Sequence, residues 1–97
     1  MSTNRSIFSD ALMYDEMGVI TGSVTAVQFP TGTCGAIRFK ADVDNVGTFN
    51  LGHDVNNCSF PMRAGDDTGW AQTTDTNRYW HSNASGSVDY LYFWLQK

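Results

Sequence analysis

The sequence predicts an all-β protein: an antiparallel β-sandwich or jelly-roll-like barrel preceded by an N-terminal arm. Three observations indicate this fold class. From residue 18 onward, apolar and polar residues alternate with a period of two. Strand-like runs recur at roughly 8–12-residue spacing and are separated by turns rich in Gly, Asn and Asp. No helical pattern lies between these runs, which argues against a βαβ arrangement.

The length of the chain favours a single hydrophobic core. A chain of 97 residues is too short to bury two separate cores. Hydrophobic residues make up 41% and aromatic residues 13%, whereas charged residues make up only 16%, against roughly 25% in soluble domains. We therefore expect an arm or short helix over 1–17 and one β-sandwich domain over 18–97, with an uncharged polar surface.

The first 17 residues differ in pattern from the rest. Ser9 is a suitable N-cap for a short helix over 10–17, and Gly18 would end it. Such a short helix is marginal alone, so its apolar side chains need a surface to pack against. That surface is either the protein's own core or a neighbouring subunit. We predict interface positions in this arm at Ile7, Phe8, Leu12, Met13 and Tyr14.

The middle of the chain predicts three strands. Alternating runs cover 24–29, 34–41 and 47–52, with a tight turn at 42–45. In the second run the pattern places Ile37 and Phe39 on one face. Between residues 53 and 77, Asn, Asp, Gly and Thr predominate. We expect loops there, with short extended pieces near 60–62 and 70–72.

The end of the chain predicts a brief strand at 78–81, a turn at 82–86 and a long strand over 87–96. This last strand is apolar on both faces. Leu91, Phe93 and Leu95 alternate with a second apolar set: Val88, Tyr90, Tyr92 and Trp94. A sandwich interior covers only one face of a strand, and Tyr and Trp are enriched at protein interfaces. We therefore predict Tyr90, Tyr92 and Trp94 as interface residues.

Charge and hydropathy limit the partners. The net charge is −4, and no Lys/Arg cluster is present to neutralise successive phosphates, so we expect no nucleic-acid partner. No apolar run approaches the roughly 18–20 residues that span a bilayer, and no signal-peptide pattern follows Met1. We expect a soluble protein that is made in a cytoplasm and has no membrane partner.

The sequence contains no recognised catalytic or metal-binding signature, so we expect no enzyme, cofactor or metal. His53 and His81 stand outside any triad pattern. The segment 42–47 resembles a calcium loop only superficially, because Val46 and His53 stand where oxygen ligands are needed. Cys34 and Cys58 favour two buried free thiols, although their spacing leaves a disulfide open.

Residues 24–97 resemble small bacteriophage virion proteins of the β-sandwich decoration or head-fibre type. The order and spacing of five segments carry the resemblance: 24–30, 36–41, 45–52, 60–65 and 88–92. The resemblance implies an antiparallel sandwich that sits on a virion and makes contacts without turning over a substrate. Residues 1–17 are an added segment relative to that group, and we expect them to serve in attachment.

We therefore predict a capsid decoration or cement protein that binds the outer surface of a phage head and stabilises it by bridging subunits. The expected partners are the major capsid protein and sister copies. We expect a homo-oligomer and favour a trimer. The alternative is a glycan-binding or adhesion module on a head or tail fibre, with Trp70 and Trp80 stacking on sugar rings.

Overall fold

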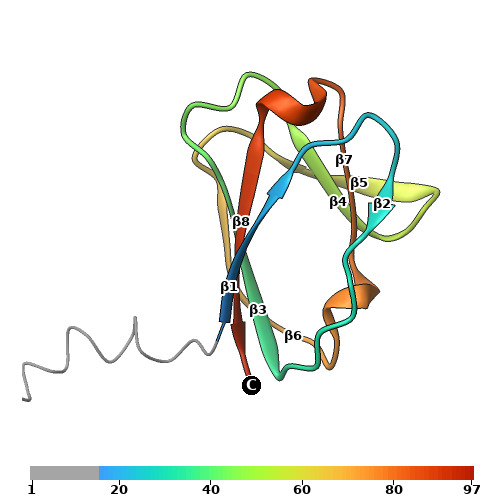
Figure 1. Cartoon of the computed structure of the whole chain (residues 1–97), viewed down its shortest axis with the longest axis vertical. Coiled ribbons are helices and arrows are strands. Elements are labelled where there is room, and N and C mark those ends of the chain that lie inside the picture. The colour runs from blue at the N-terminus through green and yellow to red at the C-terminus, as the bar shows by residue number, and fades with distance from the viewer. Residues whose placement is uncertain (1–15) are drawn as a thin grey trace, which may run out of the picture.

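The computed structural model describes residues 16–97, which form two four-stranded antiparallel sheets packed face to face (Figure 1). Sheet A has the order β1 (Glu16–Thr21), β8 (Tyr90–Gln96), β3 (Ala36–Ala41) and β6 (Asp67–Gln72). Sheet B has the order β2 (Val27–Gln28), β7 (Trp80–Asn83), β4 (Phe49–Asp54) and β5 (Asn57–Met62). The predicted all-β sandwich is confirmed.

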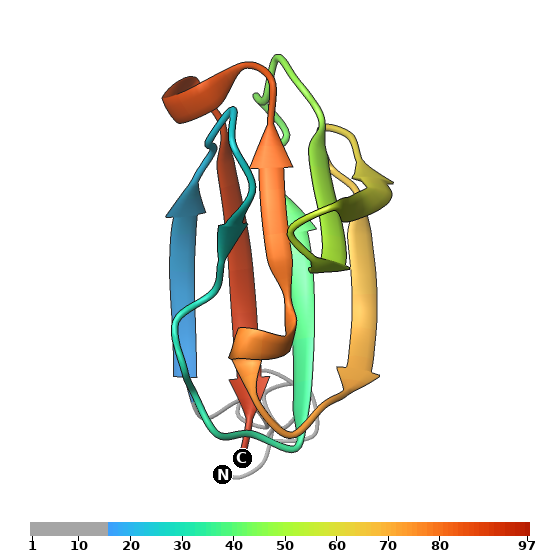
Figure 2. The ribbon, with the colours of Figure 1, turned by 90° about the vertical axis from the view of Figure 1, so that its right-hand side faces the viewer.

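Two short 3-10 helices are the only helical elements within residues 16–97: η1 (Thr76–Arg78) and η2 (Gly86–Val88). Neither of them has the length and apolar character needed to cross a membrane. Strands β5 and β6 form the edges of the two sheets on one side of the sandwich, and β1 and β2 form those on the other (Figure 2).

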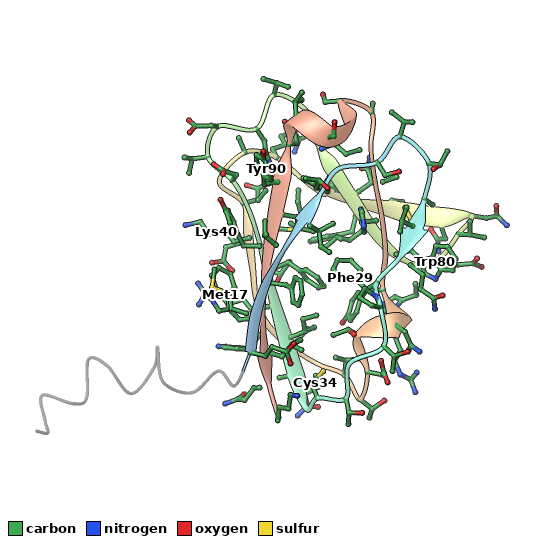
Figure 3. All side chains as sticks on the ribbon, in the orientation of Figure 1. Met17, Phe29, Cys34, Lys40, Trp80 and Tyr90 are labelled. Carbon is green, nitrogen blue, oxygen red and sulfur yellow. The ribbon has the colours of Figure 1, made fainter. Side chains whose placement is uncertain are left out.

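The core lies between the two sheets and takes side chains from both. Phe29 is at its centre, between the sheets (Figure 3), with ring centroids 5.4 Å from Phe39 and 5.7 Å from Phe93. The other large buried side chains alternate along the strands as a half-buried sheet requires: Ile37, Phe49, Leu51, Met62, Leu91 and Leu95. The inward set predicted for the last strand is therefore confirmed, with Phe93 partly buried.

Several predicted boundaries were wrong. Met17 was assigned to a helix ending before Gly18, but Glu16–Thr21 pair with β8 as strand β1. The sandwich thus begins two residues earlier than expected. The rest of that predicted helix lies outside the described residues. At 24–29, only Val27 and Gln28 pair with a neighbour.

The region 53–77 contains more strand than predicted. The extended pieces expected near 60–62 and 70–72 are six-residue strands, β5 and β6, and β4 continues through the expected loop residues His53 and Asp54. Their polar side chains do not prevent pairing, because both are edge strands with one side towards solvent.

Strand β8 begins at Tyr90 rather than Ser87, because residues 86–88 form η2 and Asp89, which is buried, is the C-cap of that helix. Its carboxylate accepts hydrogen bonds of 2.8 Å from the amides of Val46 and Gly47 and from Asn83 Nδ2. Burial alone would raise the pKa of Asp89, but these hydrogen bonds hold it below its ordinary value. Val88 consequently lies in η2 and is exposed, so it is not part of the strand face to which it was assigned.

Two glycines allow close approach between strands. A Cβ at Gly52 would lie 1.7 Å from the carbonyl oxygen of Asn57, at the point where the β4–β5 register shifts. A Cβ at Gly18 would lie 2.4 Å from the Phe93 ring, so this ring occupies the space beside the glycine of its partner strand. Side chains at these positions would push β5 or Phe93 out of place.

Candidate interaction face

The outer face of sheet A carries a continuous set of large side chains, and we call it the aromatic face. It follows from the strand register: residues directly opposite one another in neighbouring strands project to the same side of a sheet. One cross-strand row reads Met17, Trp94, Arg38 and Trp70 from β1 to β6. The next cross-strand row contains Val19, Tyr92 and Lys40. Beyond it, Tyr90 at the start of β8 lies opposite Thr21 at the end of β1.

Much of this face is open to solvent. Met17 is 51% exposed, Val19 55%, Tyr90 43% and Trp70 42%, while Tyr92 and Trp94 between them are half-buried. An antiparallel sheet ordinarily turns polar residues to solvent on its outer side. A contiguous apolar patch on such a side typically marks an interaction site. Figure 3 shows Met17 and Lys40 on this side of the molecule, opposite Trp80 on the other.

Arg38 is fixed at the centre of the face by two neighbours. Its Nε donates to both carboxylate oxygens of Asp67, at 3.0 and 3.2 Å, and its Nη2 also bonds that carboxylate. Its guanidinium carbon lies 5.4 Å from the Trp94 ring centroid, a cation–π contact. The hydrogen bond to Arg38 lowers the pKa of Asp67 and raises that of Arg38, so the pair stays ionised.

A second polar contact orients Tyr92. Its hydroxyl donates to Asp42 Oδ2 at 2.8 Å. The amide of Asp44 and this hydroxyl lower the pKa of Asp42, whereas the pKa of Tyr92 is raised by the same hydrogen bond. A shallow hollow of about 320 Å³ lies beside Tyr92, and Met17, Lys40 and Trp94 also line it. The face therefore offers rigid rings and a hollow that a partner's side chain can fill.

The predicted interface residues fall into two groups. Tyr90, Tyr92 and Trp94 lie on the outward side of β8 as the alternation indicated. The arm positions Ile7, Phe8, Leu12, Met13 and Tyr14 lie outside the described residues. Met17, Val19 and Trp70 were not predicted for the face. The period of two across 70–72 was the available signal for Trp70, but the order of the strands was needed to place it beside Arg38.

Trp70 and Trp80 do not form one glycan site. Trp70 projects from the outer face of sheet A, opposite Arg38. Trp80 pairs with Gly52 and Gln28 on the outer side of β7, because the next residue, His81, is buried in the core. The two indoles therefore lie on opposite sides of the sandwich, and no single ligand ring can contact both.

The other candidate residues are dispersed. His81 is 3% exposed and lies in the core beside Phe29, whereas His53 lies at the surface end of β4. Burial lowers the pKa of His81. Both thiols are free: Cys34 is buried and Cys58 half-buried, and burial raises the pKa of each.

The acidic residues serve local structure. Asp42 Oδ1 accepts a hydrogen bond from the amide of Asp44, which closes the predicted turn at 42–45. Asp66 Oδ2 accepts from the amide of Arg63 at 2.8 Å, in the turn between β5 and β6. Across residues 16–97, no three His, Cys, Asp or Glu side chains are grouped so as to hold a metal ion.

Comparison with protein-family models, curated proteins and solved structures finds no match to this chain.

Proposed function

We propose that this protein is a structural accessory protein of a phage particle, a decoration or cement protein that attaches through the aromatic face. The observation that carries the proposal is the outward row of Met17, Trp94, Arg38 and Trp70 on sheet A, in which Met17 and Trp70 are exposed. The sequence resemblance of 24–97 to virion accessory proteins supplies the class of particle.

The chemistry of the aromatic face suits attachment to protein. Its rings lose little conformational entropy on binding, because Arg38 and Asp42 already hold Trp94 and Tyr92. Aromatic residues and Arg are enriched among the residues that dominate interface energies. Repetition of a modest contact over many capsid sites adds avidity. The proposed partners are the major capsid protein and sister copies on the capsid surface.

The test uses capsids of the phage that encodes the chain, produced without this protein, and purified full-length chain. Binding is measured by co-sedimentation over a range of concentrations, together with the temperature at which particles release their genome. The proposal expects saturable, stoichiometric binding and a higher release temperature. Failure to sediment with the capsid would contradict it.

Two matched variants locate the contact. Val19→Glu places a carboxylate on the aromatic face, whereas Val24→Glu makes the same change at a 69% exposed loop position. Because an unpaired charge buried in an interface is costly, Val19→Glu should weaken binding by about tenfold or more. Val24→Glu should bind as the wild type does. Equal binding by both variants would show that the aromatic face is not the contact.

Glycan binding is a second candidate function, and one observation favours it. Trp94 and Trp70 flank Arg38 two strands apart, which places their backbone positions about 9–10 Å from each other. Two indoles in one row, Trp70 exposed and Trp94 half-buried, are suited to stacking on successive sugar rings, with Asp67 nearby as a hydrogen-bond acceptor. A glycan array decides this: saturable binding that Trp70→Ala abolishes and Trp80→Ala preserves would favour this function over capsid attachment.

A further inference from the structure

The two sheets separate at one side of the sandwich, between edge strands β5 and β6. A hollow of about 300 Å³ lies there, lined by apolar and aromatic side chains of both sheets, among them Phe39, Leu51, Phe60 and Ala71. Phe60 pairs with the inward-facing Leu51 yet is 57% exposed, because no strand covers β5 at this edge. The hydrophobic interior is therefore open to solvent at this point.

A second, more polar hollow of about 510 Å³ adjoins the first. It is lined by Gln72, Thr73, Thr74 and Arg78, and it shares His53 and Tyr79 with the apolar hollow. The shared residues are well fixed: the His53 and Tyr79 rings lie 4.9 Å apart, and Tyr79 packs edge-on against Phe39 at 5.1 Å. Together the hollows resemble a small-molecule site, with an apolar pocket beside a few polar groups.

The only formal charge among the residues lining the two hollows is the cation of Arg78. Its Nε donates to Thr74 Oγ1 at 3.0 Å, and no salt bridge to it occurs among residues 16–97. The nearest acidic residue in sequence, Asp75, is held by backbone amides: its Oδ1 accepts from Gly32 and Asn77, each at 3.0 Å, and these hydrogen bonds, with a smaller contribution from the charge of Arg78, lower its pKa. A positive group thus faces a hollow without a carboxylate in its lining.

His53 adds a second polar group at the junction of the hollows. Its Nδ1 bonds the carbonyl oxygen of Arg78 at 3.0 Å, which orients the ring. Because a carbonyl oxygen only accepts, Nδ1 is the donor in this bond; no hydrogen bond to Nε2 occurs among residues 16–97, so this nitrogen can accept one from a donor group of a ligand.

We propose that the paired hollows bind a small carboxylic acid with an aromatic or short acyl body. The apolar body occupies the space between the sheets, and the carboxylate accepts hydrogen bonds from Arg78 at the rim. The volume of the apolar hollow suits a body of this size, and a guanidinium favours a carboxylate through paired, charge-assisted hydrogen bonds. This site is separate from the aromatic face and does not depend on the proposed function.

The full-length chain is titrated with 3-phenylpropionate and with octanoate. Binding is measured by calorimetry and by the NMR shifts of the His53 and Tyr79 ring protons. The neutral analogue 3-phenylpropionamide tests the role of the charge. We expect saturable binding of the acids, and binding of the amide that is weaker by about tenfold or more. Absence of saturable binding by both acids would overturn the proposal, as would equal affinity for acid and amide.

Matched variants separate the two parts of the site. Arg78→Gln should weaken acid binding by about tenfold and leave amide binding nearly unchanged, whereas Arg63→Gln, at an exposed arginine outside both hollows, should change neither. Ala71→Met fills the apolar hollow and should reduce binding of acid and amide alike. Thermal unfolding of each variant verifies that it is folded. If Arg78→Gln and Arg63→Gln bind the acids equally, the assignment of Arg78 is wrong.

Discussion

The outer faces of the two sheets differ in chemistry although the sheets share one architecture. Sheet B presents small or polar residues on most of its outer side, among them Gln28, Asn50 and Ser82, and Trp80 is its one large ring. Sheet A presents two indoles, two phenols, Met17 and Val19 around the Arg38–Asp67 pair.

This difference distinguishes apolar residues that the fold requires from apolar residues that it does not require. A two-sheet sandwich needs only the inward faces to be apolar. Sheet B follows that rule, so its sequence is explained by the fold. The outer residues of sheet A exceed what the fold requires, and the proposed attachment to a partner would account for them.

Substitutions on the two sides of β8 should differ most in the stability that they cost. Leu91→Ala removes a fully buried side chain and should reduce the free energy of unfolding by about 2–5 kcal/mol. Tyr90→Ala, one residue earlier on the aromatic face, should cost less than about 1 kcal/mol. Urea unfolding of both variants measures the difference. A cost for Tyr90→Ala that equals that of Leu91→Ala would assign the outer face to the folding core.

The next effect concerns the inner face of sheet B, where His81 is buried beside Phe29 and Phe49. Burial lowers the pKa of His81 in the folded chain. As the pH falls, the unfolded chain therefore takes up a proton on this imidazole first, near its ordinary pKa of about 6.5. Stability should therefore fall as the pH decreases from 7 to 5, by at most about 1.4 kcal/mol per pH unit from this group.

Thermal unfolding at several pH values checks this expectation. His81→Phe should flatten the dependence between pH 7 and 5, because the buried ring no longer titrates. His53→Asn, which changes the surface histidine, should leave the dependence in place. A wild-type stability that is constant across this range would refute the role given to His81.

The smallest loss of stability is expected at the polar centre of the aromatic face. Arg38→Gln removes the ion pair with Asp67 and the cation–π contact with Trp94. Since these groups are partly exposed, we expect a loss of about 0.5–1 kcal/mol at low salt and less at high salt. Asn50→Ala, on the outer face of sheet B, is the control and should be insensitive to salt. A loss unchanged by salt would mean that packing, not charge, holds Arg38.

The sequence predicted a strand and its buried face where apolar and polar residues alternate strongly within one stretch of the chain. The strands around Ile37 and Phe39 and around Leu91 and Leu95 were predictable, because their buried positions recur every second residue. The outward orientation of Tyr90, Tyr92 and Trp94 followed from the same alternation.

The sequence could not reveal features that depend on strand order. Trp70 joins the aromatic face only because β6 pairs with β3 across Arg38, a pairing between residues far apart in the chain. Met17 was missed because its local residues favour a helix, whereas pairing with Trp94 places it in a strand. Asp89 fell within the predicted last strand, and no local pattern indicates that Val46, Gly47 and Asn83 donate the hydrogen bonds that make its burial favourable.

Hydroxyl-radical footprinting of the chain, free in solution and bound to capsids, can show whether attachment occurs through the aromatic face. The method reports the solvent exposure of individual Met, Trp and Tyr side chains. If the aromatic face is the contact, Met17, Trp70 and Tyr90 should become protected on binding while Trp80, on the opposite face, keeps its reactivity. Protection of Trp80 with unchanged reactivity at Met17, Trp70 and Tyr90 would contradict attachment through this face.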